Sequence, residues 1–191
     1  MAGFQLPGPI CRLLGALEID SGTLCRSASP VPGPLASPQP AKTDLSQWTG
    51  DSAQWTQEKK LRSMNLLLRP KVQAVIKALQ ALGFQPKIFY GWRSVAVQLD
   101  LYKKGNSQVK FSFHNAQLPD GTPNSYAADI IDSRYGWSSE AETSGFWKAL
   151  GEEARKNKLY WGGDWSSFRD WAHVQLVDND QLAAVKRWSG L

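Results

Sequence analysis

The chain offers two histidines and a small set of carboxylates from which a catalytic site could be built. His114 and His173 are the only histidines among its 191 residues. Two neutral imidazoles and one carboxylate are a known ligand set for a catalytic zinc ion, which keeps a further coordination position open for water. The sequence therefore predicts one Zn2+ ion per chain, bound by both histidines and a carboxylate.

Asp129 is the best-placed carboxylate for the third ligand position. It lies in Tyr126–Asp132, an apolar run that predicts a buried strand, and side chains two residues apart on a strand share a face. Ala127 on that face leaves room for a metal ion. Asp132 would point to the opposite face and Asp120 falls in a turn-rich loop, but either remains an alternative ligand.

Asp170 is the candidate general base. It precedes His173 by three residues, so on a regular strand the two side chains would face opposite ways. We therefore expect Asp170 on a turn leading into the strand, from which it could reach a water molecule on the metal without binding the metal. Zinc lowers the pKa of such a water toward about 7. On these spacings alone the alternative is that both histidines are structural.

Three further residues could support this chemistry. Arg93 lies between a predicted strand and a predicted helix, and its guanidinium suits a carboxylate or a developing oxyanion, with a surface ion pair as the alternative. Asp164 lies in a tight turn and could orient His173 or Arg93, or only form the turn. Ser112 is a weaker candidate for a supporting contact.

An aromatic run from Tyr160 to Trp171 could wall a cleft for a sugar or a peptide. Such runs more often pack in a core. Trp171 could do both, because an apolar neighbour of Asp170 keeps the site dry and strengthens its electrostatics.

The elements that must position these residues mix helices and strands without a regular alternation, which favours an α+β fold with a small sheet. Helical spacing of apolar residues and the stop at Gly83 predict one helix, and Ser94 caps a second. The expected helices are Val72–Leu82, Val95–Lys104, Glu140–Lys156 and Gln181–Trp188, and the expected extended segments are Lys87–Trp92, Phe111–Asn115, Tyr126–Asp132, Leu159–Trp161 and His173–Val177.

Composition excludes several classes of protein. The net charge of +5 suits an acidic polymer, either a nucleic acid or an anionic cell wall. No basic stripe supports nucleic acid, so we expect no such partner. No run reaches the roughly 18–20 apolar residues of a membrane helix, so we expect no stable membrane insertion. Two cysteines are too few for a disulfide framework.

Residues 1–45 differ from the rest. They hold seven of the eleven prolines and both cysteines, and Ser27–Lys42 has too little apolar surface to offset its ordering entropy. We therefore expect a disordered tail or linker over 1–45 and one catalytic domain over 46–191. A signal peptide is a poor fit, because Arg12 and Glu18 interrupt the apolar stretch near the start.

From about Met64 to Leu176, the chain resembles the zinc peptidases that include D-alanyl-D-alanine carboxypeptidases and phage L-alanyl-D-glutamate endopeptidases. The matching stretches, in the order of that family, are Gly91–Ser94 with Gln98 and Leu101–Tyr102, Ser112–Asn115, Ala127–Asp129, Leu159–Trp165 and Phe168–Leu176.

The resemblance implies roles for individual residues. The zinc ligands of the family correspond to His114, Asp129 and His173. Its general base corresponds to Asp170, an aspartate here as in the endopeptidase branch. Its arginine that stabilises the substrate carbonyl or oxyanion corresponds to Arg93.

The family also implies a fold of the hedgehog and D-Ala-D-Ala peptidase type, with an antiparallel sheet that carries the zinc site. The implied activity is an endolysin-like hydrolysis of peptidoglycan stem peptides by a monomer, at the L-alanyl-D-glutamate bond. The alternatives are a D-alanyl-D-alanine carboxypeptidase and a non-catalytic wall-binding or phage structural module. The expected location is the cytoplasm until release to the cell wall, or otherwise the periplasm or the exterior.

Two departures from the family pattern concern the segment between the first two ligands. His114 and Asp129 are fifteen positions apart, which is longer than usual, and Ser125 stands where glycine is common. The extra residues form a loop, Gln117–Asn124, which could reshape the cleft. A longer loop costs little closure entropy, so the ligand set can survive it.

Overall fold

The computed structural model describes residues 44–191. The tail expected over 1–45 lies outside these residues except for Asp44 and Leu45, so its disorder stays a prediction. Asp44 caps a short 3-10 turn, Leu45–Trp48, by accepting a hydrogen bond from the Ser46 amide.

Four short strands form one antiparallel sheet in the order β1-β2-β4-β3. The strands are β1 (Pro86–Tyr90), β2 (Ala127–Asp132), β3 (Tyr160–Trp161) and β4 (His173–Gln175). The register pairs Asp129 with Tyr90 on one side and with His173 on the other. Two of the predicted zinc ligands therefore lie on adjacent strands, directly opposite each other. The predicted small antiparallel sheet is confirmed.

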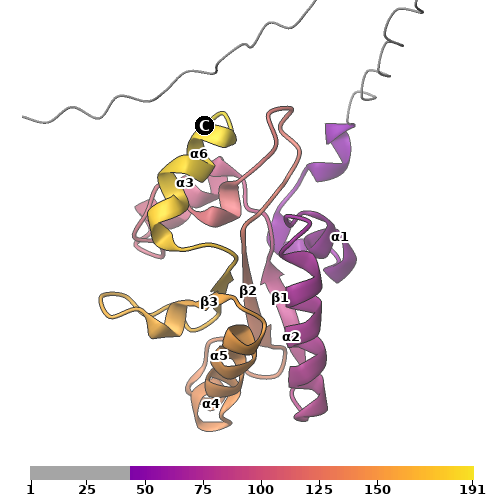
Figure 1. Ribbon diagram of the computed structural model, residues 1–191, viewed down its shortest axis with the longest axis vertical. Coiled ribbons are helices and arrows are strands. Elements are labelled where there is room, and N and C mark those ends of the chain that lie inside the picture. The colour runs from indigo at the N-terminus through magenta and orange to yellow at the C-terminus, as the bar shows by residue number, and fades with distance from the viewer. Residues whose placement is uncertain (1–43) are drawn as a thin grey trace, which may run out of the picture. The chain divides into compact units, whose positions relative to one another are not determined.

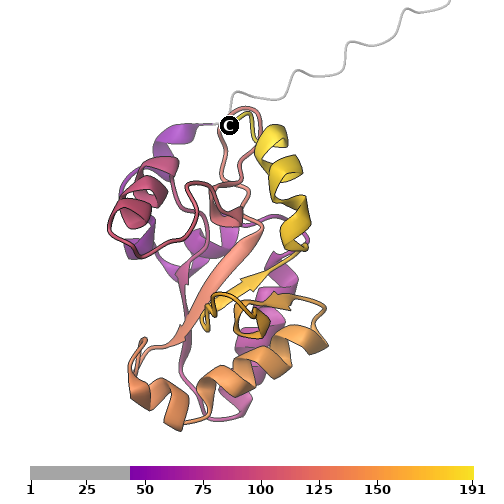
Figure 2. The same ribbon diagram turned by 90° about the vertical axis from the view of Figure 1, so that its left-hand side faces the viewer.

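Six α-helices surround the sheet in the described part of the chain. They are α1 (Gln57–Arg62), α2 (Arg69–Ala81), α3 (Val95–Lys103), α4 (Ser139–Thr143), α5 (Phe146–Lys156) and α6 (Leu182–Trp188). Helices α4 and α5 lie toward one end of the sheet, whereas α3 and α6 lie toward the other (Figures 1 and 2). None of the helices within 44–191 is long and apolar enough to cross a membrane.

The main core lies between the sheet and two helices. Val75 of α2, Ile130 of β2 and Leu150 of α5 are fully buried in one apolar cluster. Side chains alternate along a strand, so Ala128 and Ile130 enter this core while Asp129 between them lines a cavity. The alternation in β2 thus joins the core on one side of the sheet to the candidate site on the other.

Several predicted boundaries differ from the observed ones. The helix expected over 140–156 is two helices, because the backbone at Gly145 turns left-handed (φ 80°) between α4 and α5. Leu82, the expected last residue of the first helix, follows the end of α2 and is 59% exposed. The segment expected to be extended at 111–115 instead ends in a 3-10 turn, Phe113–Asn115.

Candidate active site

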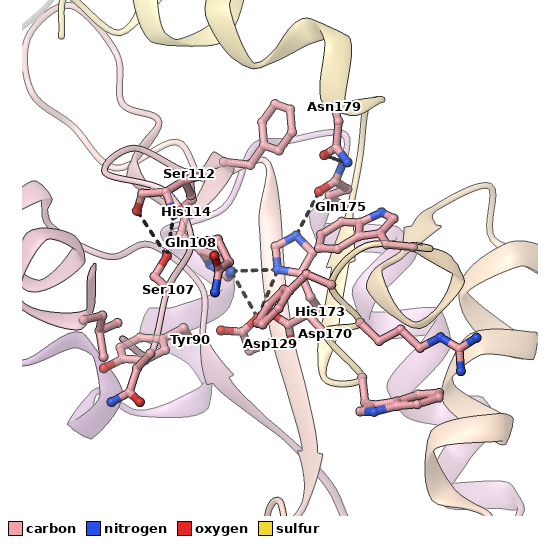
Figure 3. A pocket seen from close by; sticks show the side chains of 18 of the residues that line it. Tyr90, Ser107, Gln108, Ser112, His114, Asp129, Asp170, His173, Gln175 and Asn179 are labelled. Carbon is pink, nitrogen blue, oxygen red and sulfur yellow. Dashed lines mark hydrogen bonds and ion pairs between the residues drawn. The ribbon is translucent and has the colours of Figure 1, made fainter. Parts of the chain in front are cut away.

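Three ligand atoms from separate segments converge at one buried point (Figure 3). His114 Nε2 lies 3.1 Å from Asp129 Oδ1, and His173 Nδ1 lies 3.2 Å from each of these two atoms. A tetrahedral zinc ion with the usual bond lengths holds its ligand atoms about 3.3–3.6 Å apart. The three residues are at most 6% exposed. The separations and burial fit a small cation with little adjustment.

Hydrogen bonds on the far side of each imidazole turn a lone pair toward this point. His114 Nδ1 lies 2.7 Å from the carbonyl oxygen of Gly91, so it carries the proton and leaves Nε2 bare. His173 Nε2 lies 2.9 Å from Gln175 Oε1. The Gln175 amide nitrogen donates to the Val177 carbonyl and to Asn179 Oδ1, which fixes Oε1 as the acceptor. His173 Nδ1 is therefore bare as well.

In these tautomers the cluster consists of two imidazole lone pairs and one carboxylate oxygen. All three atoms are hydrogen-bond acceptors, and none carries a proton to donate to the others. Such a donor set is suited to a metal ion, and the partners on the far side orient the ligands. Gln175 was not singled out from the sequence. Its signal was the strand period, since Gln175 lies two residues after His173 and shares its face.

His114 is held by a turn that is tied to the segment after β1. Ser112 and Asn115 form a reciprocal capping box around the 3-10 turn. The Asn115 side chain donates to the Arg93 carbonyl at 2.7 Å, and the Arg93 amide donates to the His114 carbonyl at 2.9 Å. These bonds fix the first ligand relative to Arg93.

Burial and charge act differently on the three ligands. Burial lowers the pKa of His114, against the attraction of Asp129. At His173 burial works in the same direction, but the hydrogen bond and charge of Asp129 outweigh it and raise the pKa. Burial disfavours the Asp129 charge, yet His114, His173 and Arg93 keep the pKa of Asp129 well below its usual value. Asp129 is therefore ionised, and protons on His173 compete with a metal ion in acid.

Asp170 occupies the turn that leads into β4, as predicted. The His173 amide donates to the Asp170 carbonyl, and the Asp170 amide donates to the Gly162 carbonyl. A Cβ at Gly162 would collide with the Asp170 carbonyl oxygen, so this approach requires glycine. The side chain lines the cavity. Burial, reinforced by the charge of Asp129, raises the pKa of Asp170, which suits a group that accepts and returns a proton.

Arg93 is buried against the ligand set. Its Nη2 donates to Asp129 Oδ2 and its Nη1 to Gln98 Oε1, both at 2.9 Å. The guanidinium lies 4.3 Å from the centroid of the Tyr90 ring. Its Nε is buried without a hydrogen-bond partner in the described part of the chain. Arg93 thus holds the second oxygen of Asp129, while its Nε–H has no partner within residues 44–191.

Gln98 connects Arg93 to the cavity wall. It is fully buried, and its amide nitrogen donates to Ser107 Oγ and to the Val109 carbonyl. Ser112 Oγ donates to the same Gln98 oxygen that accepts from Arg93, at 3.1 Å. The supporting contact expected of Ser112 therefore reaches Arg93 through Gln98. Gln98 matched the family pattern, but its sequence position alone gave no role.

Of the two alternatives for Asp164, the structure supports a place in the turn and not the orientation of His173 or Arg93. Asp164 accepts two hydrogen bonds from the Arg155 guanidinium, at 2.6 and 3.0 Å, and contacts neither His173 nor Arg93 in this way. Its turn, Gly162–Asp164, directs the side chain toward α5. Gln175 contacts His173 and Gln98 contacts Arg93 in the way that was considered for Asp164.

A cavity of about 1160 Å³ opens over the ligand cluster (Figure 3). One wall is the loop that contains Trp165, Phe168 and Trp171, so part of the aromatic run faces the cleft. Trp161 belongs to the core and donates to the Trp171 carbonyl. The loop 117–124 contributes no residue to the lining of this cavity. It instead contacts Ser189 after α6, through Gln117.

The sequence is similar to those of known peptidases. Residues 99–176 match the model of a family described as D-alanyl-D-alanine carboxypeptidase. The chain is 28% identical over 145 residues to the peptidoglycan L-alanyl-D-glutamate endopeptidase CwlK of Bacillus subtilis. The matched region covers 66% of this chain and 84% of CwlK.

Two solved structures are also similar. The L-Ala D-Glu endopeptidase ChiX of Serratia marcescens is 24% identical, with a TM-score of 0.46, over 65% of this chain and 88% of ChiX. The LdcB LD-carboxypeptidase is 20% identical, with a TM-score of 0.40, over 67% of this chain and 72% of LdcB.

A buried His–Asp–His cluster with a carboxylate nearby, set on an antiparallel sheet, is an arrangement that fits a metallopeptidase. The chain is similar to the peptidase family of the D-alanyl-D-alanine carboxypeptidases over residues 99–176, which is the family that its sequence motifs resemble.

Proposed function

We propose that this peptidase is zinc-dependent and opens the L-alanyl-D-glutamate bond of peptidoglycan stem peptides. The observation that carries the proposal is the convergence of His114 Nε2, Asp129 Oδ1 and His173 Nδ1, all oriented as acceptors. These residues would hold one zinc ion, and residues 46–191 would form the catalytic domain.

When bound there, zinc supplies Lewis-acid activation of a water molecule and of the substrate carbonyl. Asp170 takes the proton from the attacking water and then passes it to the leaving amine. Its raised pKa favours that return. Arg93 keeps Asp129 ionised and in place, and its guanidinium can donate to substrate in the cavity that the residue lines.

The choice of bond rests on two indications. CwlK, the curated relative, is an L-alanyl-D-glutamate endopeptidase, and the base is an aspartate. The second candidate is a D-alanyl-D-alanine carboxypeptidase, which the description of the matching family model favours. Both activities use the same site and differ in the residue whose amine is released.

The test is to incubate the zinc-loaded chain with purified sacculi and to identify new termini by mass spectrometry. We expect new amino termini on glutamate and new carboxyl termini on L-alanine. Release of free D-alanine would instead support the second candidate. Binding to sacculi with one equivalent of zinc and no opened bond would contradict the proposal and indicate a non-catalytic wall-binding module.

A further inference from the structure

Two arginines line the cavity within the described chain, and only one has its charge neutralised by the protein. Arg93 forms an ion pair with Asp129 at 2.9 Å. Arg169 forms no ion pair within 4.0 Å with any carboxylate of residues 44–191. A cation left unpaired at the wall of a cleft is available to an anionic group of a ligand.

The carboxylates nearest to Arg169 along the chain have other partners. Asp164, which also lines the cavity, is paired with Arg155. Asp170 accepts a hydrogen bond from the Ala172 backbone. Arg169 is exposed, so water and salt solvate its charge until a ligand displaces them.

Arg169 is oriented by an aromatic ring. Its guanidinium carbon lies 5.5 Å from the centroid of the Trp171 ring, and Trp171 itself lines the cavity. A cation–π contact restricts the planar guanidinium without cancelling its charge. The fork of N–H donors therefore stays free to bind a carboxylate in a bidentate manner.

The position of Arg169 in the sequence relates it to one side of the scissile bond. It directly precedes Asp170, which returns the proton to the leaving amine in the proposed function. The residue that owns this amine therefore lies against the loop that carries both side chains. A glutamate with one carboxyl group in a peptide bond keeps its other carboxyl group free, and a terminal D-alanine also carries one.

We propose that Arg169 binds the carboxylate of the residue whose amine is released, and so selects a residue with a free carboxylate on that side of the bond. The inference rests on the proposed function. For the endopeptidase the ligand is the free carboxylate of glutamate, and for the carboxypeptidase it is the chain-terminal carboxylate. The recognition chemistry is the same in both cases.

The test uses zinc-loaded full-length chain and pairs of synthetic stem peptides that differ in one group. In the first pair the free carboxyl group of glutamate is an acid or an amide, and in the second pair the chain terminus is an acid or an amide. We expect the wild type to prefer the acid in one pair by about 10- to 100-fold in kcat/KM, mainly through KM. The pair that shows the preference identifies which carboxylate is bound.

Variants assign the preference to Arg169. Arg169→Gln should lower kcat/KM for the acid to the value for the amide, and Arg169→Lys should restore part of the difference. Arg187→Gln removes the same charge from exposed α6, away from the cavity lining, and should leave the preference unchanged. An Arg169→Gln variant with the full acid preference would overturn the proposal.

A binding measurement separates this inference from the proposed function. Asp170→Asn should hold peptide without cleaving it, so calorimetry on this variant gives dissociation constants for acid and amide, with and without Arg169→Gln. Tighter binding of the acid that depends on Arg169, without cleavage by the wild type, would support the inference and contradict the proposed function. Cleavage without a preference for either acid, together with binding that does not distinguish acid from amide, would support the proposed function and contradict the inference about Arg169.

Discussion

Strand β2 carries two buried aspartates, three residues apart, in opposite chemical surroundings. Asp132 is enclosed by donors: its oxygens accept from the Gln85 amide and from the amide, Nε and Nη2 of Arg134, at 2.7–2.9 Å. Asp129 accepts from Arg93 through one oxygen, but its other oxygen faces the bare nitrogens of His114 and His173.

The difference shows that burial of a charged group does not by itself mark a catalytic site. Hydrogen-bond donors already contact both carboxylate oxygens of Asp132, so this residue anchors the turn after β2 and does not require a metal ion to balance its charge. Asp129 lies among acceptors, which are compatible with one another only around a proton or a metal ion. The comparison also removes Asp132 as an alternative ligand. Asp120, the other alternative, does not line the cavity.

The largest effect should come from removing the charge of Asp129. Asp129→Asn places an amide among the imidazoles, so we expect loss of bound zinc and a fall in activity of more than about 100-fold, since partners outside the ligand set already cost 10- to 100-fold. Metal content by mass spectrometry and hydrolysis of sacculi are the measurements. Asp132→Asn, on the same strand, is the control and should keep one equivalent of zinc. Equal zinc loss in both variants would contradict the contrast.

Asp170→Asn should reduce kcat by about 100- to 10,000-fold while zinc remains bound, because the carboxylate moves protons and is not a ligand. Steady-state kinetics together with metal content measures this. Loss of zinc from Asp170→Asn would instead make Asp170 a ligand or a structural residue. Asp164→Asn, which changes a carboxylate of the same cavity that is paired with Arg155, is a matched control.

The cluster of His114, Asp129 and His173 was predictable from the sequence because both signals are local. Histidine is scarce in this chain, and the two-residue period of a strand is enough to place Asp129 and Asp132 on opposite faces of the sheet. Their partners were not predictable in this way. The Gly91 carbonyl that orients His114 lies 23 residues away, and the Gln98 contact with Arg93 depends on how α3 packs.

The incorrect predictions concern short segments, where the local pattern is weakest. The turn at 113–115 exists because Ser112 and Asn115 cap each other, which outweighs the extended conformation expected there. Asp164 could have faced either way from its turn, and the exposed Arg155 on α5 supplies its partner. The four-strand order and the pairing of Asp129 with His173 arise from tertiary contacts between distant segments.

A smaller effect tests the orientation of His173. Gln175→Leu removes the acceptor of the Nε2 proton, so we expect zinc affinity to fall by about 10- to 100-fold. Competition with a chelator measures the affinity. Gln175→Glu retains a hydrogen-bond acceptor, so it should retain more of the zinc affinity than Gln175→Leu. Gln117→Leu, on the loop outside the cavity, should leave the zinc affinity unchanged. Unchanged affinity in Gln175→Leu would mean that the strand alone orients the imidazole.

The smallest effect concerns Asp132 and appears in stability rather than activity. The hydrogen bonds from Arg134 lower the pKa of Asp132 from 3.8 to about 2, so the folded state favours its charged form. This contribution is complete above pH 4–5 and disappears as pH falls through about 2. We expect Asp132→Asn to cost about 1–2 kcal/mol of unfolding free energy at neutral pH, allowing for screening at the partly exposed Arg134. The difference from wild type should shrink between pH 5 and pH 2.

Urea denaturation of the metal-free proteins measures this difference in stability. Asp100→Asn, whose carboxylate pairs with Lys104 in solvent, is the control and should cost much less stability at neutral pH. A stability difference for Asp132→Asn that does not change with pH would show that this aspartate acts through packing and not through charge.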